Sequence, residues 1–354
     1  MRGKYYKIIS VVFLIVLIPG LASRKIHAEL FNPNTDWFMR AKYGLFMHFL
    51  GEIHLNSTDW NQLVSDFDVN TVVKQLEQVE AGYFFITLGQ NSGYYCAPNS
   101  TYDLYTGCTA GEKCSIRDLP SDIYEALKVK NIKLMLYLPS GPPKYDKKAC
   151  TALGWNLSVQ RKAKLSKNRI QGLPTGVFKK RWSEIIQEWS DHYGDKIAGW
   201  WFDGARPELY DESYLEAFAR AAKHGNPNCI VAFNMGAGLK PFSHYTDFED
   251  YTGGHGQRHL NDVPASRWVN GSQWHALTYI GTNWGKANCR FSEKEWINYI
   301  KTCSEKGGVV TLDVGPNKDR SKGPIGMISE QQMNQLLAIK NAIRITYRQE
   351  RKGH

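Results

Sequence analysis

The sequence predicts an α/β protein, a (β/α)₈ TIM-like barrel in a single domain. Short apolar runs alternate with amphipathic stretches over most of the 354 residues, which is the pattern of parallel βα units. The runs are continuously apolar, as is typical of strands buried on both faces. No Gly-rich phosphate fingerprint follows the first run. Its absence disfavours the competing fold, an open doubly wound sheet.

Seven apolar runs are interpreted as strands. They are YGLFMHF (43–49), YFFITL (83–88), KLMLYL (133–138), IAGWWF (197–202), CIVAFN (229–234), LTYIG (277–281) and GVVTLDVG (308–315). A closed barrel needs an eighth strand before residues 277–281. The weaker segment YTDFED (245–250) is the candidate for that position.

Between the strands, apolar residues recur at the spacing of one helix face. The sequence predicts helices over 70–80, 121–130, 178–193, 213–224, 292–306 and 329–343. No repeat or linker divides the chain, and it ends soon after the last of these helices. We therefore expect residues 29–354 to form one barrel domain without a C-terminal β-sandwich.

Residues 1–28 have the layout of a secretory signal peptide. Basic residues precede an apolar run from Ile8 to Ile18, and Pro19 and Gly20 break that run before a short cleavage region. Spanning a bilayer takes roughly 20 apolar residues, so an uncleaved anchor is the less favoured alternative. The expected location is secreted or periplasmic, without stable membrane insertion.

The formal net charge is +10, but five of the basic residues fall within residues 1–28. The remaining excess sits largely in RKAKLSKNR (161–169) and the C-terminal tail. Basic runs are usually solvated, so nucleic-acid binding is not inferred, although a weak preference for acidic polymers such as sulfated glycans is compatible with the charge. The sequence has no zinc-binding CxxC pair or HExxH motif. Its seven cysteines permit disulfides in an exported protein and leave at least one thiol over.

In a barrel, functional groups gather at the carboxyl ends of the strands. The strand-end candidates are His48, Gln90, Asn91, Tyr137, Asp203, Asn234, Glu249, Asp250 and Trp284. Asp203 stands out because it closes the apolar run IAGWWF, where burial of a carboxylate must be compensated by hydrogen bonds or charges. From position alone, Asp203 could equally cap the following helix or pair with Arg206.

Four segments, in order, resemble the family 29 glycoside hydrolases, the retaining α-L-fucosidases. They are WFMRAKYGLFMHFL (37–50), IIQEWSDHYGDKIAGWWFDG (185–204), ALTYIGTNWGK (276–286) and INYIKTCSEKGGVVTLDVGPNKD (297–319). The last is long and fairly specific. The matches run from about residue 36 to 330 and imply the same barrel.

The resemblance implies roles for several residues. Asp203 matches the catalytic nucleophile, which forms a glycosyl-enzyme ester in a retaining mechanism. His48 matches a histidine that binds sugar hydroxyls; alone, it could be a satisfied core residue. Tyr137, Trp201 and Trp284 match residues of the sugar pocket, whereas Trp200 should face the barrel wall. The implied partner is a fucosylated glycan or oligosaccharide, and this chemistry needs no metal or organic cofactor.

The sequence also departs from the family. Its second strand typically ends in paired histidines that hold the sugar, and here GQNSGYY (89–95) puts Gln90 and Asn91 in their place. Amides exchange hydrogen bonds but carry no charge. For the catalytic acid/base we expect Glu249, with Asp250 and His255 as alternatives. Residues 92–114 form either a lid over the substrate or an insertion stapled by cystines.

Three hypotheses follow, in order of preference. The first is a secreted exo-acting retaining glycosidase that cleaves terminal α-L-fucosyl linkages. The second is a glycosidase of the same scaffold that acts on another sugar, because of Gln90 and Asn91. The third is a carbohydrate-binding protein that has lost catalysis, because no second carboxylate is evident.

Overall fold

The computed structural model describes residues 32–52, 54–159, 169–236, 242–256 and 259–350, with side chains up to residue 343. All of them belong to one unit, residues 31–354. The predicted signal segment, residues 1–28, and most of the basic run 161–169 lie outside the described residues. None of the described helices is both long and apolar enough to cross a membrane.

Seven parallel strands form one curled sheet in the order β5-β4-β3-β2-β1-β9-β8. Each of the seven apolar runs predicted as strands is confirmed. The strands are β1 (Tyr43–Met47), β2 (Tyr83–Thr87), β3 (Lys133–Pro139), β4 (Ile197–Asp203), β5 (Ile230–Asn234), β8 (His275–Tyr279) and β9 (Val309–Val314). A short antiparallel hairpin, β6 (Trp268–Val269) with β7 (Ser272–Gln273), precedes β8.

Residues 250–256 occupy the eighth position, between the edge strands β5 and β8. On one side, the Asp250 N–H donates to the Val231 carbonyl at 2.7 Å. On the other side, bridges join Tyr251 to Gln273 and His255 to Leu277. This segment, not residues 245–250, closes the ring. It contains no regular strand because its two adjacent glycines and polar residues supply no apolar run.

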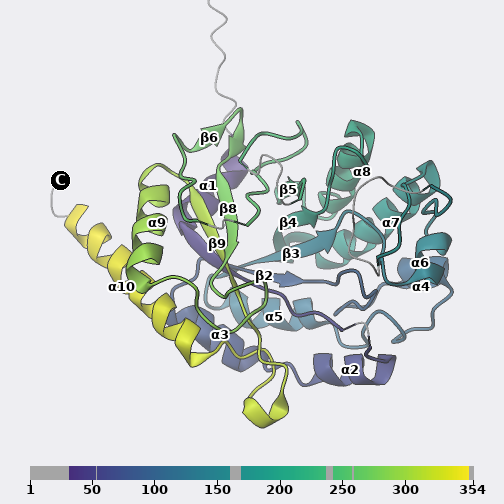
Figure 1. The fold of residues 1–354 in the computed structure, drawn as a ribbon, viewed down its shortest axis with the longest axis horizontal. Coiled ribbons are helices and arrows are strands. Elements are labelled where there is room, and N and C mark those ends of the chain that lie inside the picture. The colour runs from purple at the N-terminus through teal and green to yellow at the C-terminus, as the bar shows by residue number, and fades with distance from the viewer. Residues whose placement is uncertain (1–31, 53, 160–168, 237–241, 257–258, 351–354) are drawn as a thin grey trace, which may run out of the picture. The chain divides into compact units, whose positions relative to one another are not determined.

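The six predicted helices are all present and surround the strands (Figure 1). They are α3 (Val69–Gln78), α5 (Leu119–Lys128), α7 (Gly176–Tyr193), α8 (Glu212–Ala222), α9 (Glu293–Glu305) and α10 (Glu330–Glu350). Side-chain caps start them: Asp68 accepts from the Thr71 N–H before α3, and Ser292 forms a capping box with Glu295 before α9. Shorter helices join them: α1 (Asp36–Ala41), α2 (Ser57–Ser65), α4 (Ser100–Thr106) and α6 (Lys147–Ala152).

The core has two parts because successive strand residues face opposite sides of the sheet. A large cluster lies between the sheet and the helices and contains Trp200. A smaller cluster inside the ring contains Phe46, Tyr137 and Trp201. Trp200 therefore faces the barrel wall, as predicted. No β-sandwich follows β9 within the described residues, where the chain continues into η3 (Arg320–Lys322) and α10.

All seven cysteines are free thiols, and five of them are buried. The segment 92–114 is therefore not stapled by cystines. It is also less irregular than expected, because α4 lies within it and the Tyr95 N–H donates to the Lys113 carbonyl. Trp189 of α7 packs on Tyr95 at a ring-centroid distance of 5.4 Å, so part of this segment belongs to the core.

Candidate active site

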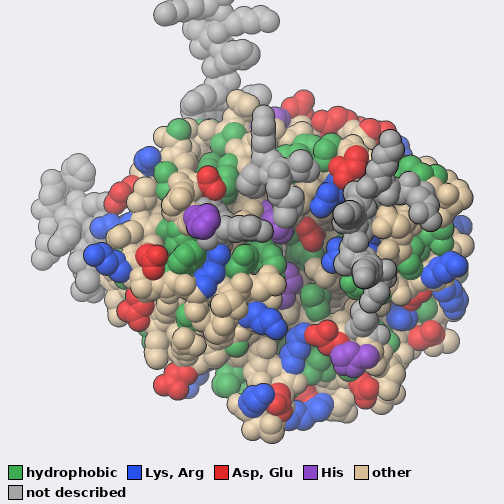
Figure 2. All heavy atoms as spheres, viewed as in Figure 1, with side chains coloured by type: hydrophobic (Ala, Val, Ile, Leu, Met, Phe, Trp, Pro, Cys, Tyr) green, Lys and Arg blue, Asp and Glu red, His purple; other side chains and the backbone are tan. Residues whose placement is uncertain are grey.

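A cavity of about 580 Å³ lies at the carboxyl ends of the strands. Side chains from most of the strand ends line it, including His48 after β1, Tyr137 of β3 and Asp203 of β4. On the face shown in Figure 2, acidic and histidine side chains are visible in a central hollow, with Lys and Arg side chains around it. This size is ordinary for a small-molecule site.

Asp203 ends β4, and both oxygens of its carboxylate accept hydrogen bonds. Oδ2 accepts from the Tyr137 hydroxyl and Oδ1 from the Asn234 amide, each at 2.7 Å. Gly204 follows with φ +71°, which turns the chain directly after the strand. Asp203 neither pairs with Arg206, whose partner is Glu208, nor caps α8, which Asp211 caps. The carboxylate is therefore fixed at the cavity without serving the following helix.

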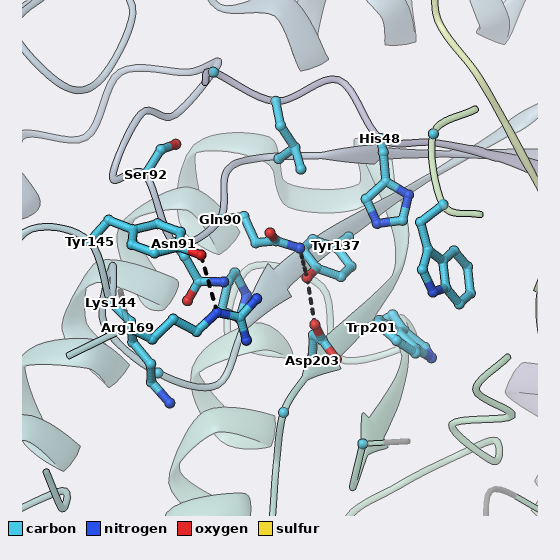
Figure 3. Close-up of a pocket in the computed structure, with 18 of the residues that line it drawn as sticks. His48, Gln90, Asn91, Ser92, Tyr137, Lys144, Tyr145, Arg169, Trp201 and Asp203 are labelled. Carbon is cyan, nitrogen blue, oxygen red and sulfur yellow. Dashed lines mark hydrogen bonds between the residues drawn. The ribbon is translucent and has the colours of Figure 1, made fainter. Parts of the chain in front are cut away.

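Two side chains, Gln90 after β2 and Tyr137 of β3, form a hydrogen-bonded chain that ends at Asp203. The Gln90 amide donates to the Tyr137 hydroxyl at 2.8 Å, which directs the hydroxyl proton toward Asp203. Burial, followed by the Asp203 charge, raises the pKa of Tyr137 well above its usual value. The phenol therefore keeps its proton and remains a donor. Gln90 lines the cavity and donates one of its two amide hydrogens to Tyr137, and its neighbour Asn91 also lines the cavity (Figure 3).

Asn234 connects Asp203 to His255. Its Oδ1 accepts from the Gly236 N–H, so its Nδ2 has two hydrogens to donate. One goes to Asp203, and the other points to His255 Nδ1 at 3.0 Å. Burial lowers the pKa of His255, with the Asp203 charge opposing that shift. His255 is therefore neutral, with Nδ1 as acceptor and the hydrogen on Nε2.

His48 is oriented by a carboxylate within β9. Asp313 Oδ1 accepts from His48 Nδ1 at 2.8 Å, and Asp313 Oδ2 accepts from the Gly285 N–H at 2.6 Å. His48 Nε2 is thereby left for a ligand. Trp284 packs between the two histidines, with ring centroids 5.4 Å from His48 and 5.2 Å from His255.

Aromatic rings form one wall of the cavity beside Asp203 (Figure 3). Trp201 stacks on Tyr137 at 5.5 Å and on His255 at 6.4 Å. Its indole N–H donates to the Gly253 carbonyl, which fixes the ring in the barrel. An apolar ring face beside a carboxylate is the kind of surface that packs against the C–H face of a sugar.

Glu249 and Asp250 do not line the cavity. Glu249 directly precedes the segment 250–256 and Asp250 is its first residue, so both lie where it begins, and His255 lies near its carboxyl end. The Glu249 side chain is fully buried, and its Oε1 accepts from the Tyr245 N–H and the Ser272 hydroxyl. Asp250 accepts from the Val231 N–H and from Lys223, each at 2.7 Å. This placement argues against the acid/base role expected of Glu249, and against Asp250.

Three functional candidates escaped the sequence prediction: Asp313, Glu52 and Arg169. Asp313 had a signal, because it is a carboxylate within a strand that is otherwise almost entirely apolar, as Asp203 is at the end of β4. Glu52 follows the end of β1 by a few residues, and Arg169 ends a basic run interpreted as solvated surface. Glu52 and Asp203 are the two carboxylates that line the cavity among the described residues.

Residues 56–345 match the family model described as Alpha-L-fucosidase. The chain belongs to the α-L-fucosidase family. It is thus a glycoside hydrolase of the α-L-fucosidase type, as its sequence motifs indicate. A comparison with curated proteins gives no match.

Solved structures share the fold of this α-L-fucosidase family member at low identity. Alpha-L-fucosidase AlfC from Lactobacillus casei, in complex with its alpha-L-fucose product, aligns at a TM-score of 0.61 and 18% identity. The alignment covers 90% of this chain and 100% of AlfC. The endo-fucoidan hydrolase MfFcnA9 of glycoside hydrolase family 107 aligns at 0.64 and 18%, over 87% of this chain and 63% of that one.

Proposed function

We propose that this protein is an exo-acting retaining α-L-fucosidase that hydrolyses terminal α-L-fucosyl linkages through an ester on Asp203. The observation that carries the proposal is the carboxylate of Asp203, held at the cavity by Tyr137 and Asn234 beside a wall of aromatic rings. Family membership supports the substrate class, and the fold relative AlfC is described in complex with α-L-fucose.

The two hydrogen bonds to Asp203 fit a nucleophile. Its carboxylate attacks the anomeric carbon, the glycosidic bond breaks, and the leaving oxygen takes a proton. Water then attacks the same anomeric carbon and gives its proton to the group that protonated the leaving oxygen, and the bond to Asp203 breaks to release the carboxylate. Tyr137 and Asn234 keep the carboxylate oriented through both steps, as preorganisation requires. His48 and His255 each present Nε2 to the sugar hydroxyls.

The cavity wall offers two candidates for the donor that protonates the leaving oxygen, Glu52 and His255. Glu52 is the second carboxylate there, and its Oε1 lies 3.4 Å from Lys318 Nζ. His255 lines the cavity as well, but its lowered pKa leaves it neutral and a weak acid. Glycosidases of this kind use a pair of carboxylates, which favours Glu52.

A second candidate function is hydrolysis of another deoxy or L-configured sugar on the same scaffold. It is favoured by Gln90, which stands in place of a family histidine and donates to Tyr137. A panel of aryl glycosides separates the two: turnover of another glycoside with none of fucosides selects this candidate.

The test uses 4-nitrophenyl α-L-fucoside with the purified protein and its Asp203→Asn variant. The expected result is clear turnover by the wild type and a loss of about 10⁴-fold or more in the variant. The first sugar released should be the α-anomer, observed by NMR before mutarotation. Equal rates in the two proteins would exclude Asp203 as the nucleophile, and a β-anomer would exclude retention.

We also propose that the protein is exported. The support is the signal-like layout of residues 1–28. N-terminal sequencing of the protein recovered outside the cytoplasm should begin close to residue 29. An intact Met1 on a protein retained in the cytoplasm would contradict export.

A further inference from the structure

The cavity has two chemically different sides (Figure 3). His48, Tyr137 and Trp201 surround Asp203 on one side, where the sugar ring is placed. Asn91, Ser92, Lys144, Tyr145 and Arg169 form the other side. This second side contributes no carboxylate to the cavity wall among the described residues.

The cations around the cavity differ in how they are neutralised. Arg206 pairs with Glu208 at 3.4 Å, and Lys318 pairs with Glu52 at the same distance. No carboxylate of the described part of the chain pairs with Arg169. Among the described residues, the polar contact of its side chain is a long one, 3.5 Å from Nε to the Tyr145 hydroxyl. The guanidinium therefore keeps most of its five N–H donors for a ligand.

Arg169 also acts on the side chain that holds Asp203. Burial and Asp203 raise the pKa of Tyr137, and the hydrogen bond from Gln90 and, to a smaller extent, the charge of Arg169 oppose this rise. Lys144 adds a second cation on the same side, with its Nζ 5.2 Å from the centre of the Trp155 ring. Figure 3 shows the Arg169 guanidinium beside Asn91 and Tyr145 at the cavity wall, and the residue is exposed, so a ligand in the cavity can reach it.

We propose that Arg169, with Lys144 and Asn91, binds an anionic group of the glycan, a sulfate ester or a carboxylate within one sugar of the scissile bond. The substrate class is thus an anionic fucosylated glycan. This inference rests on the proposed function, because it assumes that the fucosyl ring sits at Asp203. A guanidinium binds sulfate and carboxylate oxygens with two parallel hydrogen bonds.

Two other accounts of Arg169 make different predictions. If Arg169 belonged only to a solvated surface run, its removal would leave all substrates unaffected. If it served only to orient Tyr137 and Asp203, its removal would slow neutral and anionic substrates equally. Of the three accounts, only binding of an anionic group by Arg169 predicts that its removal changes the preference for anionic over neutral substrates.

The experiment measures kcat/KM for matched fucosyl disaccharides in the full-length protein. One disaccharide carries a sulfate ester, one is its desulfated twin, and one carries a carboxylate on the sugar next to fucose. The variant is Arg169→Gln. The matched control is Arg220→Gln, an exposed arginine on α8 that binds Glu216.

The wild type is expected to prefer an anionic disaccharide over the neutral twin by about tenfold or more. Arg169→Gln should abolish that ratio, and Arg220→Gln should keep it. Preference for the sulfated or for the carboxylated disaccharide tells the two anions apart, and either supports the proposal. No preference in the wild type, or an unchanged ratio in Arg169→Gln, would overturn it.

A binding measurement separates this inference from the proposed function. If the wild type hydrolyses none of the disaccharides, nor 4-nitrophenyl α-L-fucoside, the proposed function fails. The affinities of the sulfated, carboxylated and neutral disaccharides are then measured by quenching of tryptophan fluorescence, because Trp201 and Trp284 line the cavity. These affinities test the anion site independently of turnover. Tighter binding of an anionic disaccharide that is lost in Arg169→Gln supports the anion site, and equal affinities overturn it.

Discussion

The Tyr137 hydroxyl donates to Asp203 Oδ2 at 2.7 Å, across neighbouring strands β3 and β4. The phenol cannot turn away, because Gln90 donates to the same oxygen and Trp201 stacks on the ring. Tyr137 therefore has a second role besides lining the sugar pocket. It fixes the direction in which the Asp203 carboxylate faces the cavity.

Replacing Tyr137 with Phe should lower kcat on an aryl α-L-fucoside by about ten- to a hundredfold, because a charge-assisted hydrogen bond to Asp203 is lost. Tyr193→Phe is the matched control. Tyr193 is also buried and donates to an aspartate, Asp118, at 3.0 Å, but away from the cavity. The control should lose stability and keep kcat; equal kcat values in the two variants would contradict the role of Tyr137.

Glu249→Gln should leave hydrolysis within about threefold of the wild type, whereas loss of a general acid costs about 10²–10⁴-fold. Burial raises the pKa of Glu249 to about 8. Its unfolded-state pKa is near the ordinary value of 4.5, so the free energy of unfolding falls as the pH rises from about 4.5 to 8, where the unfolded chain has lost this proton and the folded one still holds it. Chemical denaturation at pH 9 should show the variant more stable than the wild type. A large loss of activity in a folded variant would restore Glu249 as the acid.

Glu52→Gln and His255→Gln identify the proton donor. If Glu52 donates, its variant should lose about 10²–10⁴-fold on a fucoside with a poor leaving group and much less on one with a good leaving group. His255→Gln should raise KM for both substrates, because it removes a sugar contact. A leaving-group dependence that appears in His255→Gln instead would reverse the assignment.

The fold should lose stability in acid because of His275. This side chain is fully buried, between the Thr252 carbonyl and the Thr311 hydroxyl, and burial lowers its pKa to about 3. The unfolded chain takes up the proton near its ordinary pKa, so stability falls as the pH drops from about 6.5 toward 3. His275→Gln should flatten this part of the stability profile. An unchanged slope in the variant would assign the acid sensitivity to other groups.

Most of the barrel was predictable from the sequence, because the seven strands are buried on both faces and read as apolar runs. The eighth position was not. Residues 250–256 contain Gly253 and Gly254 and bridge β5 and β8 through isolated contacts, so no run marks them. The sequence prediction placed this element at residues 245–250, which put Glu249 and Asp250 at its carboxyl end. In the structure the element begins at residue 250, so the two carboxylates lie at the opposite end from the cavity.

Individual site residues were predictable, but their pairing was not. Strand-end position identified His48, Tyr137, Asp203 and Asn234, and all four line or support the cavity. His48 is oriented by Asp313, 265 positions away. Sequence spacing carries no information about such a contact, which depends on β1 and β9 being neighbours in the closed sheet.

The most direct test of the account is to trap the covalent intermediate on Asp203. A 2-fluoro fucosyl fluoride slows the second step, so the ester should accumulate in the wild-type protein. Mass spectrometry of the digested protein should then show one fucosyl label on the peptide that contains Asp203. A label on another carboxylate would contradict the nucleophile assignment, and turnover of the parent fucoside without any label would contradict a retaining mechanism on a protein carboxylate.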